Sequence, residues 1–429
     1  RVEIYHAYAK SLVERGLAYP CFCTEEELDK VRAKQEEDKV LTGYYGEYAT
    51  CRNLSYEEIE ANIKAGKPYV LRLRSQGSPD KEITFVDAIK GEIKLPENIH
   101  DIVLLKKDGI PTYHFAHAID DHLMRTTTVV RGGEWLASAP IHYELFHLLG
   151  FKMPAYAHTA HLMKFDEETG GKRKLSKRKD PELSLDYYRK DGYHPYTMKV
   201  YLLTLLNSNF EEWHEKFPDK DINEFPFSVE KMNQSGALFD KDKLHNICKN
   251  ELSKLSEEEL YDFLYDWARE NEPENVEKWF GDREKMLQIL RLYMGVGAKR
   301  RRKDLMYAKQ IFELISYFFD GESAEEMDEF KLDEDMVSKI LKSYLAKYDH
   351  NDDNSVWFNK LKEIADEHGF ASDMKAYKAN PENFKGNVSD IAEAVRIAVT
   401  GRANTPDLWT IVHIMGEEQM TERIKKHIK

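Results

Sequence analysis

A β-α-β pattern between residues 126 and 159 constrains the fold of this chain more than any other feature. The β-branched run TTTVVR (126–131) predicts a strand and leads into the glycine-rich turn RGGEW. A helix is predicted from Pro140, which is acceptable in a first turn, to Leu149, because Gly150 then ends it. The run MPAYAH (153–158) predicts the next strand. This unit indicates a parallel sheet with a ligand site at the carboxyl ends of its strands.

The segments before this unit predict a mixture of helices and strands. Residues 1–17 predict a helix that Gly16 ends, since Ile4, Tyr8 and Leu12 recur at helical spacing. The region 19–112 contains the alternating runs PYVLRLR and ITFVDAI and the buried run IVLL, all of which predict strands.

The segments after this unit predict helices almost without interruption beyond residue 180. One helix is expected over 391–400, where Gly401 closes it. The next is expected to begin at TPDLW, with Thr405 as its cap and Pro406 as its first residue. The fold class is therefore α/β plus all-α, and the expected domain boundaries lie near residues 18, 112, 171 and 255.

Composition excludes some classes of protein. No apolar run is long enough to cross a bilayer and no signal-peptide pattern is present, so a soluble protein without a membrane partner is expected. Four cysteines in 429 residues make no disulfide framework, which favours the cytoplasm. The net charge of −14 disfavours non-specific nucleic-acid binding, although concentrated basic patches still bind polyanions.

The most basic stretch of the chain is GGKRKLSKRKD at 170–180. Its centre holds Lys174 and Lys177 with the Ser176 hydroxyl between them, an arrangement that in a mobile loop wraps a triphosphate. It is not a P-loop, because no glycine precedes a Gly-Lys-Ser/Thr at the required spacing. A solvated basic loop remains the alternative.

Several long motifs carry a family resemblance. KLSKR resembles the KMSKS-type loop of class I aminoacyl-tRNA synthetases, and DGIPTYHFAHAIDDHLMRTTTVVRGGEWLAS resembles the bacterial glutamyl-tRNA synthetase family. The similarity continues through YPCFCTEEEL, GVGAKRRRKDL (295–305) and VSDIAEAVRIAVTGRANTPDLW (388–409), so it spans essentially the whole chain.

The resemblance implies ATP-dependent activation of L-glutamate, with Mg²⁺, and transfer of the glutamyl group to tRNA. It implies an incomplete Rossmann-type parallel-sheet catalytic domain with an inserted α+β domain that binds the acceptor stem, followed by helical domains for the stem and the anticodon. The segments implied are the end of the first Rossmann half (1–18), the inserted domain (19–112), the second Rossmann half (113–171), the KMSKS-type loop with the stem-contact domain (172–255) and the anticodon-binding domain (256–429).

The resemblance also assigns a glutamate pocket. It implies that Tyr113 and Arg131 hold the substrate glutamate, Arg131 by a forked pair of hydrogen bonds to a carboxylate, a task that suits a planar guanidinium better than an ammonium group. Trp135 would wall the pocket. His117 stands where relatives often carry Asn. Each residue taken alone also fits a structural role, as a core aromatic or an ion pair.

The ATP site is implied in the same way. Leu162 and Met163 would pack against adenine, while Lys174, Ser176, Lys177 and Arg178 would bind the phosphates. Lys177, and secondarily Lys174, would neutralise charge as pyrophosphate leaves.

A second basic run comprises Lys299, Arg300, Arg301, Arg302 and Lys303. Alone it would most often be a solvated face, but in this family it falls in the anticodon-binding half, where contacts to tRNA phosphates are expected.

Cys21, Cys23 and Cys51 raise the question of zinc, which some family members bind through Cys-x-Cys and a later pair. Asn53 stands where the last ligand would be and is a poor zinc ligand, so Tyr48 or Glu47 would have to complete the site. Free buried cysteines are the alternative.

Other functions fit parts of the sequence. HFAHAIDDH (114–122) is also compatible with a metal-dependent phosphohydrolase, provided that its side chains converge, or with a satisfied polar network. A tRNA-binding module without catalysis is a further alternative. A glutaminyl-tRNA synthetase would be expected to end in β-barrels, and the short paralogue that modifies a tRNA base lacks an anticodon domain.

The HIGH-type motif of class I synthetases, whose histidines steady the ATP phosphates, is not found in this sequence. We therefore expect a truncated, monomeric synthetase whose 429-residue chain has negligible glutamate-activating activity by itself.

Overall fold

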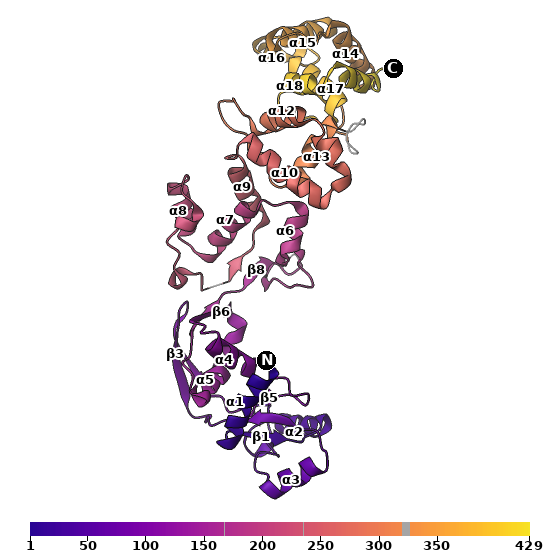
Figure 1. Cartoon of the computed structure of the whole chain (residues 1–429). Coiled ribbons are helices and arrows are strands. Elements are labelled where there is room, and N and C mark those ends of the chain that lie inside the picture. The colour runs from indigo at the N-terminus through magenta and orange to yellow at the C-terminus, as the bar shows by residue number, and fades with distance from the viewer. Residues whose placement is uncertain (167, 235, 320–326) are drawn as a thin grey trace. The chain divides into compact units, whose positions relative to one another are not determined.

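A computed structural model describes residues 1–166, 168–234, 236–319 and 327–429. The chain divides into two compact units (Figure 1). The first comprises Arg1–Leu175 and Leu203–Phe239, and the second comprises Ser176–Leu202 and Asp240–Lys429. The first unit contains sheets with parallel strands and the second is helical, which confirms the predicted fold class.

The main sheet of the first unit has the strand order β4-β3-β7-β6. Strands β6 (Thr128–Gly132) and β7 (Ala155–Thr159) pair in parallel over five residues and are joined by helix α5 (Ala139–Leu149), which confirms the predicted β-α-β unit. Strand β3 (Glu82–Asp87) pairs in parallel with β7, through Asp87 and Tyr156, and antiparallel with β4 (Gly91–Pro96). A strand from far upstream therefore ends beside β7.

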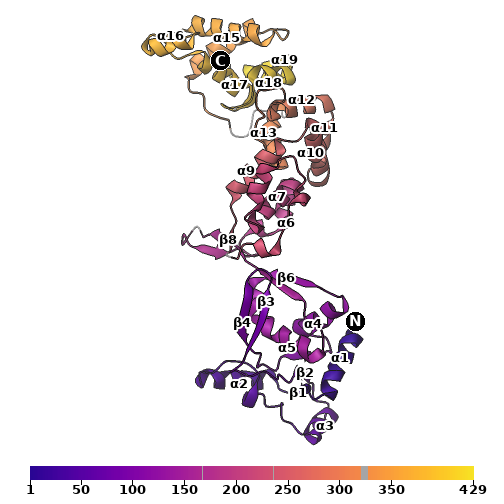
Figure 2. The ribbon, with the colours of Figure 1, turned by 90° about the vertical axis from the view of Figure 1, so that its left-hand side faces the viewer.

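Helix α5 follows the local sequence signals. Pro140 lies in its first turn, and Gly150 adopts a left-handed φ of 71° just after its end, a conformation that favours glycine. Helix α4 (Tyr113–Leu123) packs beside α5 (Figure 2), and buried Phe115, Ile119 and Phe146 fill the space between them.

The described residues of the first unit also form two smaller sheets. Strands β1, β2 and β5 form an antiparallel sheet, and β9 and β10 flank β8 in the other. Helix α1 ends at Glu14, before the predicted Gly16. The remaining bounds in this unit are α1 Val2–Glu14, β1 Ala18–Cys21, α2 Glu25–Glu37, α3 Tyr56–Lys64, β2 Val70–Leu73, β5 Val103–Leu105, β8 Leu162–Phe165, β9 Lys172–Lys174, α8 Phe210–Lys216 and β10 Ala237–Leu238.

The second unit has one large apolar core, to which fully buried Leu290, Ile340 and Val395 belong. Helix α7 (Pro195–Leu206) belongs partly to each unit. The other helices are α6 Leu185–Asp191, α9 Lys241–Leu252, α10 Glu257–Asn271, α11 Val276–Phe280, α12 Arg283–Met294, α13 Ala308–Ile315, α14 Glu334–Lys347, α15 Asn354–His368, α16 Met374–Ala379, α17 Val388–Thr400, α18 Leu408–Met415 and α19 Glu417–Lys425. Within the described ranges no helix is both long and apolar enough to cross a membrane.

The predicted start of α18 was wrong by two residues. Asp407, not Thr405, is its N-cap, because the Asp407 carboxylate accepts hydrogen bonds from the Thr410 amide (2.9 Å) and hydroxyl (2.7 Å). A carboxylate is also favourable at the positive end of the helix dipole. Gly401 closes α17 with a φ of 73°, as predicted.

Candidate active site

Four residues predicted from the sequence lie together at one end of the main sheet. The Tyr113 ring lies 4.6 Å from the Trp135 ring and is stacked on His117 at 5.8 Å, measured between centroids. The Arg131 guanidinium lies 5.9 Å from the Trp135 ring centroid, and its Nη2 donates to the Trp135 carbonyl at 3.4 Å. The structure thus brings the proposed glutamate-pocket residues into one cluster.

The fold explains this convergence. Tyr113 and His117 are one turn apart at the start of α4, so they share a face of that helix. Arg131 lies near the carboxyl end of β6, and Trp135 lies in the 3₁₀ turn that follows. The carboxyl ends of parallel strands are where α/β folds bind ligands. Tyr113 is 53% exposed and so is open to a ligand.

The Arg131 guanidinium is held by two histidines that the sequence analysis did not assign to the site. Its Nε donates to His158 Nε2 at 3.0 Å, and its Nη1 lies 3.1 Å from His142 Nδ1. Arginine has donors only, so both imidazole nitrogens must accept.

These contacts fix the tautomers of the two rings. His158 then carries its proton on Nδ1, which donates to Asp87 Oδ2 at 2.6 Å. His142 carries its proton on Nε2, which donates to His114 Nδ1 at 2.9 Å. Asp87 and His158 are fully or almost fully buried, and so is His142. A continuous hydrogen-bonded chain thus passes through Arg131.

Burial keeps these histidines neutral. It lowers the pKa of His142 to about 2, and nearby His117 and Arg131 act in the same direction. Burial also lowers the pKa of His158, although Asp87 opposes the shift. Burial tends to raise the pKa of Asp87, but its hydrogen bonds to His158 and to two backbone amides lower it overall. The cluster therefore combines the Arg131 cation with neutral rings.

His117 directs both ring nitrogens toward protein groups. Its Nδ1 lies 2.8 Å from Asp121 Oδ2, and its Nε2 lies 3.0 Å from the Tyr156 hydroxyl. Burial lowers the pKa of His117. The ring face that stacks on Tyr113 is therefore the part of His117 closest to the predicted pocket.

The sequence did contain a signal for Asp87, His142 and His158, which were not predicted as site residues. Asp87 is the last residue of β3, and His158 lies next to the last residue of β7, so both follow the rule that functional side chains gather at strand carboxyl ends. His142 is a polar residue on the buried face of the otherwise apolar helix α5.

The run HFAHAIDDH does not converge on a metal site. The Asp120 carboxylate accepts a hydrogen bond from the Tyr5 hydroxyl (2.8 Å), and the His122 ring stacks on Phe151 at 3.7 Å. In the part of the chain that the structure describes, one group of three or more His, Cys, Asp or Glu side chains is close enough to hold a metal, and it is the cysteine group. The phosphohydrolase interpretation thus lacks its metal centre.

A cavity of about 490 Å³ opens beside the carboxyl ends of β6 and β7. Met163, one of the two predicted adenine contacts, lines this cavity. Leu162, the other predicted contact, is not one of the lining residues, and its carbonyl accepts a hydrogen bond from the Leu175 amide at 2.9 Å. Gly236 packs closely against Met163, because a Cβ at this position would lie 2.4 Å from Met163 Cγ. The lining residues are Lys90, Gly133, Leu136, Thr159, Ala160, His161, Met163, Lys172, Gln234 and Gly236.

The predicted phosphate-binding loop crosses from the first unit into the second after buried Leu175. In the first unit, Lys174 Nζ lies 3.3 Å from Glu134 Oε1. In the second unit, the Ser176 amide donates to Asp180 Oδ2 at 2.7 Å, and Lys177 and Arg178 lie exposed in the turn that follows. The side chains needed for anion binding are accessible.

The second basic run borders a cavity of about 730 Å³ in the helical unit. Arg300 and Arg302 line this cavity, as do Trp409 and His413 of α18. Arg302 pairs with Asp304 at 2.6 Å, and Lys303 Nζ donates to Asn250 Oδ1 at 2.7 Å. Lys299, Arg300 and Arg301 are exposed. Two cations of the run thus line a cavity that Trp409 and His413 also line.

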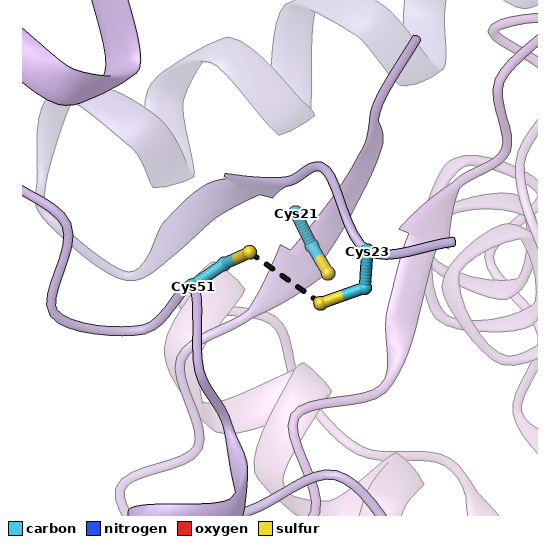
Figure 3. A group of neighbouring side chains, drawn as sticks. All are labelled: Cys21, Cys23 and Cys51. Atoms are coloured by element: carbon cyan, nitrogen blue, oxygen red, sulfur yellow. Dashed lines mark hydrogen bonds between the residues drawn. The ribbon is translucent and has the colours of Figure 1, made fainter. Parts of the chain in front are cut away.

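The three cysteines predicted as zinc ligands point toward one another (Figure 3). Their sulfur atoms all lie within 4.8 Å of one another, and Cys23 Sγ and Cys51 Sγ are 3.5 Å apart. Tyr44 Oη lies 3.4 Å from Cys21 Sγ and 3.3 Å from Cys23 Sγ. Tyr48, an expected fourth ligand, donates instead to Asp38 at 3.1 Å.

Comparison with known proteins identifies relatives along the whole chain. The family model described as "tRNA synthetases class I (E and Q), catalytic domain" matches residues 1–246, and "Anticodon binding domain" matches residues 259–428. A glutamate–tRNA ligase of Acetivibrio thermocellus is 53% identical over 99% of this chain and 78% of its own length. A glutamate–tRNA ligase of Clostridium perfringens is 46% identical over the full chain and 78% of its own length.

The fold is also similar to that of a solved protein. The crystal structure of a glutamate tRNA ligase from Elizabethkingia meningosepticum, in complex with its amino acid, matches with a TM-score of 0.74 and 26% identity. The match covers all of this chain and 82% of that one.

Proposed function

Since this chain belongs to the glutamate–tRNA ligase family of class I aminoacyl-tRNA synthetases, we propose that the cluster around Arg131 is its glutamate-binding site. The observation that supports this most directly is the convergence of Tyr113, Arg131 and Trp135 at the carboxyl end of β6. A planar guanidinium with free N–H groups pairs with a carboxylate in a fork, and the aromatic rings wall the remaining surface.

The cavity lined by Met163 and Gly236 is proposed to bind ATP. Membership of the class I synthetases implies ATP together with Mg²⁺, which would shield the negative charge of the phosphates. Met163 would contact the adenine ring from one wall, with Leu162 beside it on β8. Lys174, Ser176, Lys177 and Arg178 are proposed to bind the phosphates of ATP.

Glutamate activation and its transfer to tRNA proceed in two steps. In the first, a glutamate α-carboxylate oxygen attacks the α-phosphorus of ATP, the bond to the bridging oxygen breaks, and glutamyl-adenylate and pyrophosphate form. In the second, a terminal ribose hydroxyl of tRNA attacks the activated carbonyl and AMP leaves. Binding at Arg131 orients the nucleophile for the first step, and Lys177 neutralises the negative charge that develops on the departing pyrophosphate.

The tRNA would be held at several places. Lys299, Arg300, Arg301, Arg302 and Lys303 are proposed to contact the anticodon arm. Lys299, Arg300 and Arg301 are exposed, and Arg300 and Arg302 line a cavity that Trp409 also lines. The segment 19–112 is proposed to bind the acceptor end, and the segment 172–255 the stem.

Zinc is a further proposal. The three sulfur atoms of Cys21, Cys23 and Cys51 have the mutual spacing of a tetrahedral thiolate site, so the residues present fit the ion. Tyr44 Oη faces the same centre, but burial raises the pKa of this phenol, so the protein would supply the three thiolates as ligands. Bound zinc would cross-link β1 to the loop around Cys51.

We also propose that the enzyme is a cytoplasmic monomer, and sedimentation equilibrium tests its oligomeric state.

The test of the glutamate site is the Arg131→Lys variant of the enzyme. Lysine keeps the charge but loses the fork, so we expect the KM for glutamate to rise about a hundredfold, while the KM for tRNA changes little. The matched control is Arg125→Lys, at an exposed position before β6, which should keep the wild-type KM. A glutamate KM within twofold of wild type for Arg131→Lys would place the amino acid elsewhere.

A further inference from the structure

We infer that His142 and His158 are positioning residues that hold the Arg131 guanidinium in the one orientation that binds the substrate carboxylate. This inference rests on the proposed glutamate site. It concerns residues that do not themselves touch glutamate but that contact its proposed ligand from helix α5 and strand β7.

The N–H groups of the Arg131 guanidinium divide into those that donate to protein acceptors and those that remain for the substrate. Arg131 Nε–H is used by His158, one Nη1–H by His142, and one Nη2–H by the Trp135 carbonyl. A guanidinium has five N–H groups, one on Nε and two on each terminal nitrogen. These three contacts leave one N–H on each terminal nitrogen, and Tyr113 is the neighbouring side chain that interacts with the guanidinium. A carboxylate of the substrate would be bound by this remaining pair.

Each histidine is fixed by a partner behind it. Asp87 accepts from His158 Nδ1 at 2.6 Å and is itself held by the Ile89 and Lys90 amides, at 3.0 and 2.9 Å. His114 accepts from His142 Nε2 at 2.9 Å. Because both rings are buried and doubly hydrogen-bonded, neither can rotate without leaving a buried polar group unpaired, which is unfavourable.

The choice of histidine has a chemical reason. A carboxylate in direct contact with Arg131 would hold it as firmly, but it would offset the positive charge and compete with the substrate for the same donors. A neutral imidazole accepts a hydrogen bond and leaves the charge for the substrate. The Asp87 carboxylate is kept one ring away from Arg131 by His158.

The test uses pairs of variants that differ in whether the accepting atom is retained. His142 accepts through Nδ1, whose place an Asn side-chain oxygen takes, and His158 accepts through Nε2, whose place a Gln oxygen takes. The variants are therefore His142→Leu and His158→Leu, which remove the acceptor, and His142→Asn and His158→Gln, which retain it. His147→Leu, at an exposed position of the same helix α5, is the control.

We expect each Leu variant to raise the glutamate KM about 10- to 100-fold, as the loss of one hydrogen bond to a charged group does, with kcat and the KM for ATP within threefold of wild type. The Asn and Gln variants should restore the glutamate KM to within about fivefold. The inference is overturned if the Leu variants keep the wild-type KM, or if the amide variants are as impaired as the Leu variants.

Two outcomes separate this inference from the proposed site. If Arg131→Lys raises the glutamate KM but neither Leu variant does, the site stands and the positioning role falls. If Arg131→Lys has no effect, the site itself falls. Should a Leu variant fail to fold, His142→Ala or His158→Ala, which also removes the accepting atom, takes its place. A selective rise in the glutamate KM then supports the positioning role, whereas a loss of kcat or stability without that rise overturns it.

Discussion

Arg131 Nε donates to His158 Nε2 across 3.0 Å, so a neutral ring and not a carboxylate holds the cation at the end of β6. The contact joins two neighbouring parallel strands, and Asp87 on a third strand, β3, completes it through a 2.6 Å hydrogen bond. Each of these strands places its polar residue at the carboxyl end. The orientation of one guanidinium therefore depends on the parallel register of three strands.

Stability of the first unit should fall as the pH drops below about 6.5, the ordinary value for histidine. Burial lowers the pKa of His142 to about 2, so between these two values the unfolded chain binds a proton that the folded chain does not. The free energy of unfolding should decrease by about 1.4 kcal/mol for each pH unit lost in this window from His142 alone. Hydrogen exchange of the α5 amides in urea, at pH 7.5 and at pH 5.5, measures this dependence.

The control for this prediction lies on the same helix. His142→Asn removes the titrating group, so the pH dependence of α5 exchange should weaken, whereas His147→Asn changes an exposed residue and should leave it intact. Equal pH dependence in wild type and His142→Asn would show that His142 is not held neutral by the fold.

Local patterns predicted the β-α-β unit because each of its signals acts within a few residues. The strand TTTVVR, Pro140 and Gly150 each affect only their neighbours, and the observed bounds of β6 and α5 follow them closely. The cap of α18 was missed because Thr405, Pro406 and Asp407 all suit a helix start. Asp407 is the N-cap because its carboxylate accepts hydrogen bonds from both the amide and the hydroxyl of Thr410.

Asp87 and His158, which support Arg131, could not be predicted from local patterns. Asp87 and His158 are 71 residues apart in the chain, and they meet only because β3 pairs in parallel with β7. Tyr113, His117, Arg131 and Trp135 were found from a motif, and the structure groups them. Their partners were visible in the sequence only as polar residues at the ends of strands or on a buried helix face.

Gly236→Ala should weaken ATP binding. The added Cβ would lie 2.4 Å from Met163 Cγ and 3.1 Å from the His161 carbonyl, so the wall of the 490 Å³ cavity must shift inward or strain. Overpacking of this kind costs about 1–3 kcal/mol, which corresponds to an increase of about 5- to 100-fold in the KM for ATP. Steady-state kinetics with ATP as the varied substrate measures it. The glutamate KM serves as the internal control, and a rise in both constants together would indicate general damage instead of a nucleotide site.

Arg300→Gln and Arg301→Gln should each weaken tRNA binding and reduce its salt dependence. Both side chains are exposed, so the substitutions should not disturb the core, and each lost phosphate contact lowers the slope of log K against log salt by about 0.7–0.9. Filter binding of tRNA between 50 and 200 mM salt, roughly the range over which counterion release is resolved, gives this slope. Lys339→Gln, an exposed cation on α14, is the control and should keep the wild-type slope. Unchanged slopes for both arginine variants would remove the basic run from the tRNA interface.

Removal of zinc should loosen the segment between β1 and the loop of Cys51. If Cys21, Cys23 and Cys51 are thiolate ligands, the protein purified under reducing conditions contains about one zinc ion per chain, measured by plasma mass spectrometry. Cys51→Ser should lose the metal and increase hydrogen exchange across residues 18–54. The ion would add a cross-link between Cys23 and Cys51, whose sulfur atoms lie 3.5 Å apart, to the apolar cluster that these segments share. Cys248→Ser is the matched control, since this buried cysteine lies in α9 beside Thr197 and should not affect the zinc content. Wild-type protein without zinc, or a Cys51→Ser variant that keeps it, would mean that the three cysteines are ordinary buried thiols.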